Sequence, residues 1–333
     1  MKNKVCFIIP YFGKLPNYFP LFLKSCSYNP GYDWFLFTDD ETKYDYPGNV
    51  HRVVMAFKEL QTLVKSKYDF PVCFENAYKL CDFKPAYGHI FSDYLTDYTH
   101  WGHCDIDVIM GNLNDFISDE LLDSYDKLFS IGHFIIYKNT SHVNLCYMST
   151  YNNKVVYKDV FQTPKIMVFD EEGRTKYNVN NIFKENGFKV LDEDWSLNFS
   201  IFYTAFHRTF YVGMEKSPDG FVLERTCDHI VVWDNGCLYR YSLNRTDKEI
   251  IKEEYMYLHL QERHMSFDIS ICELNTIKIV PDKFLPLEVD EITADNYDRI
   301  IIKYLSFHKF HRFIKENRRR LKKIAKILKF EGI

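Results

Sequence analysis

Two aspartates, Asp105 and Asp107, stand one residue apart where an apolar segment ends. In an extended backbone, alternate side chains point to the same side, so both carboxylates would face one way and Ile106 would face the core. Carboxylates arranged in this way can bind one hard divalent ion, and Mg²⁺ and Mn²⁺ accept phosphate and water oxygens as further ligands. The spacing therefore predicts a metal site that also receives a phosphorylated ligand.

The sequence around the two aspartates favours a buried site over the alternative, a solvated loop after a strand. Trp101 and Gly102 open the segment, and residues 108–110 continue it with apolar side chains to Gly111. A carboxylate buried in such surroundings costs several kcal/mol unless it is paired or binds a metal. Metal binding explains the pair better than a loop does.

The preceding elements are those of an α/β protein. Residues 5–10 and 33–38 are apolar runs of strand length, separated by a predicted helix over 18–27, and residues 50–54 and 57–67 predict a further strand and helix. In open α/β sheets, ligands bind at the carboxyl ends of the strands. Asp39 lies at such an end, where it could bond a ribose hydroxyl or a base edge, or could be a charged turn.

Downstream elements complete the expected fold. We predict helices over 90–98 and 113–129, a strand over 132–138 with His133 packed beside it, and a strand over 255–263. Asn235-Gly236 predicts a tight β-hairpin over 230–241, because this pair supplies two positive φ angles. No role is assigned to residues 174–228.

Later acidic and basic residues are further site candidates. Asp170 and Glu171 follow an apolar run, as residues 192–194 do, and we prefer the first pair as catalytic carboxylates, with solvated acidic turns as the alternative. His259 lies between two leucines and could be structural, but imidazole also suits Mn²⁺. Arg263 could pair with a diphosphate.

Composition indicates a globular protein with a sizeable core. The chain has 333 residues, of which 46% are hydrophobic and 17% aromatic, and its nine cysteines show no paired spacing, so we expect reduced thiols. The first ten residues match neither a signal peptide nor a membrane span, so we expect a cytoplasmic protein.

The end of the chain is strongly basic. Residues 309–329 carry ten Lys and Arg against the single Glu316, and apolar residues recur among them. This pattern predicts a basic amphipathic helix over 309–330 that docks peripherally on the anionic inner face of the cell membrane. Nucleic acid is the rival partner for such a run, but nothing else in the chain favours it. We expect a catalytic domain over 1–265 and an extension over 266–333.

Several motifs resemble those of a known enzyme family. The sequence K-P-A-Y-G at 84–88, followed by W-G-H-C-D-I-D at 101–107 and Gly111, resembles bacterial GT-A glycosyltransferases from capsular and lipopolysaccharide gene clusters, which carry K-P-x-Y-G and W-G-x-x-D-x-D-x-x-x-G. Further likenesses are I-P-Y-F-G at 9–13, F-T-D at 37–39, G-H-F at 132–134, F-D-E at 169–171 and Y-L-H-L-Q at 257–261. The resemblance covers roughly residues 4–265.

The resemblance implies a fold, a donor and roles for the residues. The fold would be a GT-A-like, Rossmann-related mixed sheet flanked by helices, and the donor a nucleotide sugar such as a UDP-sugar. The implied donor site has the nucleoside near Tyr11, Phe12, Gly13 and Asp39, Lys84 near the diphosphate or sugar, and Mn²⁺ or Mg²⁺ held by Asp105, Asp107 and His259. The acceptor would be a saccharide or a lipid-linked glycan.

The stereochemical outcome and the reaction class stay open at this point. The order of the DxD pair, an acidic pair and a late histidine is also similar to retaining galactosyl- and glucosyltransferases, but the chain lacks their H-x-x-G-x-x-K-P-W ending. An inverting enzyme would need a general base, for which Asp170 or Glu171 is the candidate. The alternatives to sugar transfer are a metal-dependent nucleotidyltransferase and a sugar-nucleotide-binding protein without turnover.

Overall fold

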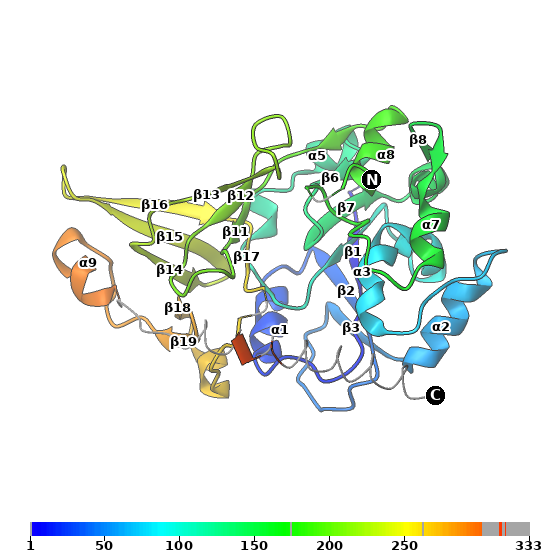
Figure 1. Ribbon diagram of the computed structural model, residues 1–333. Helices are drawn as coiled ribbons and strands as arrows, with labels where there is room; N and C mark the ends of the chain where they lie inside the picture. The colour runs from blue at the N-terminus through cyan, green and yellow to red at the C-terminus, as the bar shows by residue number, and fades with distance from the viewer. Residues whose placement is uncertain (1, 174, 262, 302–312, 315–316, 318–333) are drawn as a thin grey trace.

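Strands between residues 5 and 191 form a seven-stranded sheet with the order β10-β6-β7-β4-β1-β2-β3 (Figure 1). This computed structural model describes residues 2–173, 175–261, 263–301, 313–314 and 317. Strands β1 (Val5–Pro10), β2 (Tyr32–Thr38), β3 (Val50–Val54) and β4 (His100–Cys104) are parallel, whereas β7 (Phe134–Lys138) is antiparallel to both β4 and β6 (Lys127–Leu128), and β10 (Val190–Leu191) pairs with β6 in parallel. The predicted mixed sheet flanked by helices is confirmed.

Both faces of this sheet are buried, which explains why β1 is continuously apolar. Val5, Phe7 and Ile9 face a core that includes α1 (Phe19–Ser27), and Cys6 and Ile8 face a second core that includes α2 (Phe57–Ser66). A strand covered on both faces needs apolar side chains at every position, because successive side chains point to opposite sides. The predicted helices over 18–27 and 57–67 are confirmed to within one residue at each end.

Shorter elements complete this half of the molecule. They are α3 (Leu80–Phe83), α4 (Tyr87–Ile90), α5 (Asp119–Ser124), α6 (Ser141–Asn144), β8 (Thr150–Tyr151), β9 (Lys154–Val155), α7 (Val156–Gln162) and α8 (Val179–Glu185), with 3₁₀ turns η1 (Ala77–Lys79), η2 (Lys84–Ala86), η3 (Ser92–Tyr94), η4 (Leu113–Asp115) and η5 (Cys146–Met148).

Two predicted helices are wrong in extent. The segment predicted as one helix over 113–129 is a 3₁₀ turn, then α5, then β6, because Ser118 caps α5 by accepting the N–H of Leu121 and Tyr125 ends it in an extended conformation. The segment over 90–98 contains the last residue of α4 and then η3, because Phe91 leaves the helical conformation directly after α4. The strand expected over 255–263 also ends early, at His259.

The second half of the chain adds β-structure at the other end of the molecule (Figure 1). Strand β17 (Tyr257–His259) lies between β11 (Ser196–Asn198) and β5 (Val108–Met110), and a five-stranded antiparallel sheet has the order β16-β15-β14-β18-β19. Its strands are β14 (His229–Asp234), β15 (Cys237–Asn244), β16 (Glu249–Tyr255), β18 (Thr276–Val280) and β19 (Lys283–Pro286). Also in this half are β12 (Thr209–Tyr211), β13 (Phe221–Leu223), η6 (Ile269–Glu273) and α9 (Ala294–Ile300).

Two sequence features bear on this half. The predicted hairpin is confirmed, since β14 and β15 pair antiparallel and Asn235 and Gly236 have φ angles of 48° and 92°. After residue 265, β18 pairs with β14 and β19 pairs with β18, so the five-stranded sheet contains strands from both sides of the expected domain boundary.

The basic helix predicted over 309–330 lies outside the described residues, apart from residues 313–314 and 317. Within the described part of the chain, no helix has the length and apolar character needed to cross a bilayer.

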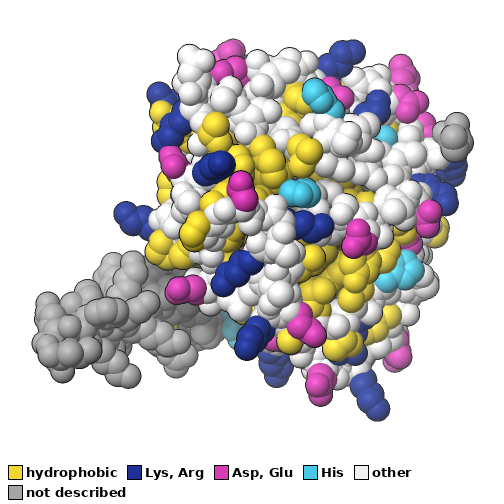
Figure 2. Space-filling model, turned by 90° about the vertical axis from the view of Figure 1, so that its right-hand side faces the viewer, with side chains coloured by type: hydrophobic (Ala, Val, Ile, Leu, Met, Phe, Trp, Pro, Cys, Tyr) yellow, Lys and Arg dark blue, Asp and Glu magenta, His cyan; other side chains and the backbone are white. Residues whose placement is uncertain are grey.

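Figure 2 views the side of α2 and α7 and shows hydrophobic patches among Lys, Arg, Asp and Glu side chains of both signs. This face therefore carries mixed charge.

Two motif segments interlock at Gly88 and Trp101. The buried Trp101 ring stacks on Tyr137 with centroids 4.4 Å apart, and its Nε1 donates to Asn144 at 2.7 Å. A Cβ atom on Gly88 would lie 2.5 Å from the Trp101 ring. Glycine at position 88 thus allows α4 to approach β4.

The substitution Gly88→Ala is therefore expected to destabilise the protein by roughly 1–3 kcal/mol, because an added methyl group overpacks a filled core. Urea unfolding followed by fluorescence measures this change. Gly48→Ala is the matched control, since Gly48 is exposed and a Cβ there meets nothing within 4 Å. Equal free energies of unfolding for the two variants would contradict the packing explanation.

Candidate functional site

Asp105 and Asp107 lie in the turn that joins β4 to β5, at the carboxyl end of β4. The sequence predicted an extended segment through the pair, but residues 106–107 form a turn. Ile106 is buried in the core as expected. The backbone of the turn is fixed on both sides, because Asp105 N donates to His133 O at 3.0 Å and Leu260 N donates to Asp107 O at 2.9 Å.

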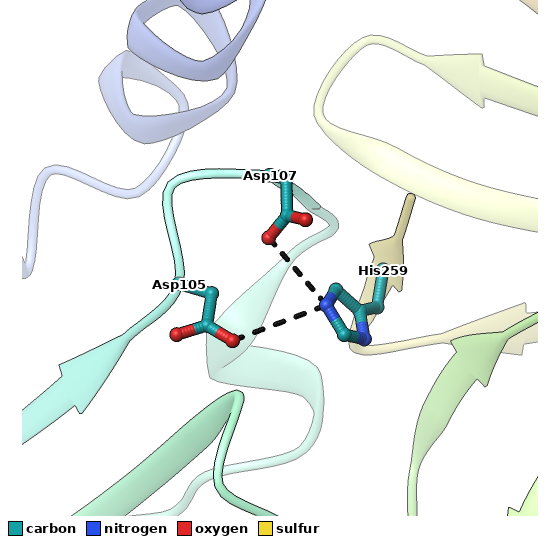
Figure 3. Close-up of side chains that lie close together, drawn as sticks. All are labelled: Asp105, Asp107 and His259. Atoms are coloured by element: carbon teal, nitrogen blue, oxygen red, sulfur yellow. Dashed lines mark ion pairs between the residues drawn. The ribbon is translucent and has the colours of Figure 1, made fainter. Parts of the chain in front are cut away.

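His259 meets this turn from a distant part of the sequence. Strand β17 pairs antiparallel with β5 in a register that sets His259 opposite Val108, next to Asp107. Its Nε2 atom lies 3.4 Å from Asp107 Oδ1 and 3.9 Å from Asp105 Oδ2. Figure 3 shows the three side chains pointing toward one another. The three predicted metal ligands are thus brought together.

The three donor atoms fit a divalent ion. They lie within 4.8 Å of one another. Neighbouring ligands of an octahedral ion with short bonds to oxygen are about 3 Å apart, so the three side chains would need to move only slightly closer together. Two carboxylates and one imidazole suit Mn²⁺ and accept Mg²⁺ less readily. The Asp105 side chain is 33% exposed and the Asp107 side chain 24%, which leaves space for oxygens from a substrate.

The charge state of His259 depends on the two aspartates. Burial favours the neutral ring, but the carboxylates of Asp107 and Asp105 outweigh it and raise the pKa of His259. The His133 ring lies beside it with centroids 4.2 Å apart, and His133 Nδ1 is 2.7 Å from the hydroxyl of Tyr257. Burial holds the pKa of His133 well below its usual range, so this neighbour stays neutral.

Lys84 is the cation of the site. Its Nζ donates to Asp105 Oδ1 at 2.7 Å and to Gly132 O at 2.8 Å, and lies 3.2 Å from Asp170 Oδ2. Burial opposes the charge, but Asp105 and Asp170 outweigh it and raise the pKa of Lys84 well above its usual range. The resemblance implied that Lys84 contacts a diphosphate or sugar, whereas these three contacts are all with the protein.

Asp170 is buried, so a solvated acidic turn does not describe it. Burial raises its pKa above the usual range, although Lys84 acts in the opposite direction. Gly132 makes this position possible, because a Cβ on Gly132 would lie 2.6 Å from Asp170 Oδ2. Glu171 is half-buried and lines the same cavity.

The competing acidic segment serves the fold. Asp192 pairs with Lys184 at 2.6 Å, and Asp194 accepts the N–H groups of Ser196 and Tyr211. These bonds connect the acidic segment to α8, β11 and β12. The catalytic role preferred for Asp170 and Glu171 stays a prediction.

The loop after β1 meets Asp39 as expected, but in a different role. Asp39 Oδ1 accepts the N–H of Gly13 at 2.7 Å, and Gly13 has a φ of 96°. Asp39 therefore fixes the loop that carries Tyr11 and Phe12. Tyr11 and Phe12 line the cavity, whereas Gly13 and Asp39 are not among the described residues that line it.

Arg263 also holds a loop. Its guanidinium donates to the carbonyls of Ser200, Tyr203 and Thr204 at 2.9, 3.1 and 3.3 Å. Burial lowers its pKa to about 10. Although Arg263 lines the cavity, these contacts direct its donors to the protein backbone and not to a diphosphate.

A cavity of about 1260 Å³ connects these groups. Beyond the predicted residues, its lining includes Tyr78, Asn198, Phe202 and Gln261. Gln261 Nε2 donates to Asn198 Oδ1 at 2.7 Å. The one sequence signal for Gln261 was its place in the segment Y-L-H-L-Q that resembles the known family. The sequence carried no signal for Tyr78, Asn198 or Phe202.

Comparison with known proteins gives a family. A family model described as a family of unknown function (DUF6625) matches residues 7–288. The chain belongs to this family. None of the curated proteins matches it.

Among solved structures, this member of DUF6625 is similar to the galactosyltransferase LgtC in complex with donor and acceptor sugar analogues. The identity is 13% and the TM-score 0.34, over 59% of this chain and 75% of that chain. An active-site mutant of LgtC is similar at 11% identity and a TM-score of 0.32, over 59% of this chain and 74% of that chain.

Replacing His259 by Gln in the DUF6625 chain is expected to weaken Mn²⁺ binding by more than about 10-fold, because even the loss of a supporting group around a metal costs that much. Titration calorimetry with MnCl₂ measures the affinity, and His142→Gln, at an exposed histidine, is the control.

An unchanged affinity in His259→Gln would mean that Mn²⁺ binds elsewhere. A second group of possible ligands, Asp115, Cys237 and Glu254, lies outside the cavity.

Proposed function

We propose that this protein is a metal-dependent glycosyltransferase that transfers a sugar from a nucleotide sugar, such as a UDP-sugar, to a saccharide or lipid-linked acceptor in surface polysaccharide synthesis. The observation that carries the proposal is the convergence of Asp105, Asp107 and His259 beside the Lys84–Asp170 pair. These groups share one large cavity at the carboxyl end of β4, where α/β sheets bind ligands.

The chemistry of sugar transfer explains the need for these charges. The reaction breaks the bond from the anomeric carbon to the diphosphate, so negative charge grows on the leaving oxygens. A bound Mn²⁺ or Mg²⁺ would stabilise that charge more in the transition state than in the ground state. Asp105, Asp107 and His259 would hold the ion, and Lys84 would keep Asp105 in place through its Oδ1 atom.

Asp170 is the proposed proton acceptor. A general base works best when its pKa is near the working pH, and burial raises the pKa of Asp170 above its usual range in that direction. In an inverting reaction it would accept the proton of the acceptor hydroxyl. Glu171, which lines the same cavity, is the second candidate for this role.

The size and lining of the cavity support two substrates. About 1260 Å³ exceeds the range of roughly 300–1,000 Å³ for pockets that hold one small molecule. Tyr11 and Phe12 would contact the nucleoside on one side. Tyr78 and Phe202 line the same cavity although they are 70% and 67% exposed, and such rings can stack on the apolar face of an acceptor sugar.

Asp107→Asn is expected to lower sugar transfer at least about 100-fold, a loss typical for removal of one charge-stabilising group. Asp107 is a sharper target than Asp105, because Asp105 also pairs with Lys84. Release of UDP from a UDP-sugar with Mn²⁺ measures the reaction, once thermal shift over a panel of nucleotide sugars has identified the donor.

The exposed Asp93→Asn serves as the control. Full turnover in Asp107→Asn would remove the metal role. Release of pyrophosphate from a nucleoside triphosphate would identify a nucleotidyltransferase, and metal-assisted UDP binding without any turnover would identify a binding protein.

The basic segment 309–330 is proposed to dock the enzyme on the membrane. Deleting residues 309–333 should reduce co-sedimentation with anionic vesicles, because each Lys or Arg near such a surface adds about 1 kcal/mol. Neutral vesicles are the control for charge. Equal sedimentation of the truncated and intact chains would contradict this role.

A further inference from the structure

A buried ion pair lies close to the proposed site but does not line its cavity. Lys79, at the end of η1, and Asp82, in α3, are 1% and 0% exposed, and Lys79 Nζ lies 2.7 Å from Asp82 Oδ2. Lys79 Nζ also donates to Val160 O at 2.8 Å and Lys165 O at 2.6 Å. A buried pair is tolerated only when its remaining hydrogen-bonding capacity is satisfied, and here that capacity is used on residues 160–169.

Asp82 binds the backbone on both sides of one residue. Its carboxylate accepts the N–H of Met167 at 2.9 Å and the N–H of Phe169 at 3.0 Å. Val168 lies between them with a φ of 56°. A β-branched residue in the left-handed region is strained, and such strain persists only where the surroundings enforce it.

This strained residue is next to the proposed catalytic carboxylate. Val168 itself lines the cavity, Phe169 is fully buried, and Asp170 reaches Lys84. Beyond Asp170 the backbone is fixed again, since Glu172 N donates to Ser130 O at 3.1 Å. Asp170 is therefore part of a segment whose backbone is fixed by Asp82 on one side and by Ser130 on the other.

We propose that Lys79 and Asp82 are positioning residues: their bonds to residues 165–169 hold Val168 in a left-handed conformation, and this conformation directs Asp170 to Lys84. The inference rests on the proposed function, because it assigns Asp170 a part in sugar transfer. It adds that the left-handed conformation of Val168 serves catalysis and lowers the stability of the folded protein.

The test compares Asp82→Asn, Val168→Gly and the double variant in the full-length protein. Without the Asp82 carboxylate, Val168 is free to return to a negative φ, which moves Asp170. We expect kcat for sugar transfer to fall on the order of 100-fold, as for small misplacements of a catalytic group, with KM for the donor little changed.

Glycine adopts positive φ without steric cost, so the double variant should recover at least about tenfold in kcat over Asp82→Asn. A purely structural role for Asp82 predicts no such recovery. A double variant no more active than Asp82→Asn, or an Asp82→Asn variant with wild-type kcat, would overturn the proposal.

If Asp82→Asn does not fold, the thermal stability of Val168→Gly alone tests whether Val168 is strained. Relief of strain predicts a thermal unfolding midpoint equal to or above that of the wild type, whereas the control Val155→Gly, at a φ of −79°, should lower it. A midpoint lowered as much by Val168→Gly as by Val155→Gly overturns the proposal. A wild-type protein that transfers no sugar rejects the proposed function together with this inference, whereas normal transfer with no recovery rejects the inference alone.

Discussion

The site depends on one ammonium group, that of Lys84, whose side chain is only 13% exposed. Lys84 lies between Asp105 and Asp170 and also bonds the carbonyl of Gly132, so it joins the turn after β4 to two later segments of the chain. Carboxylates this close repel one another and are costly to bury. Because Lys84 neutralises part of that charge within the protein, the remaining oxygens of Asp105 and Asp107 can face His259 and a cation.

The same short motifs combine chemistry with packing. In K-P-A-Y-G, Lys84 supplies the charge, whereas Gly88 makes room for the ring of Trp101. In W-G-H-C-D-I-D, Gly102 lets β7 approach, since a Cβ there would lie 2.5 Å from Ile135 O, while the aspartates turn toward the cavity. A motif match alone therefore does not separate residues that act on a ligand from residues that hold the sheet together.

Local sequence was a good guide wherever one strong local signal decided the structure. The apolar runs of β1 and β2, the helices α1 and α2, and the Asn235-Gly236 hairpin all follow from such signals. It failed over 113–129, where apolar spacing suggested one helix but the cap at Ser118 and the pairing of β6 with β7 decided the structure.

Side-chain direction was harder to predict than position. Arg263 lines the cavity and Asp39 does not, and their bonds go to the carbonyls of residues 200–204 and to the N–H of Gly13. Such choices depend on which backbone groups lack partners, and that is decided only by tertiary contacts. The hydrogen bonds from Met167 and Phe169 to Asp82 could not be predicted for the same reason. No local sequence signal indicates that Val168 has a positive φ.

The pairing of β17 with β5 makes the proposed metal site a late product of folding. His259 reaches Asp107 only through a strand contact that spans about 150 residues of chain, and contacts of such long range form slowly because a large loop must close first. A chain emerging from the ribosome therefore carries both aspartates well before their third partner exists. All three ligands can bind one ion only when β17 has paired with β5, so metal occupancy would report that this strand pairing has formed.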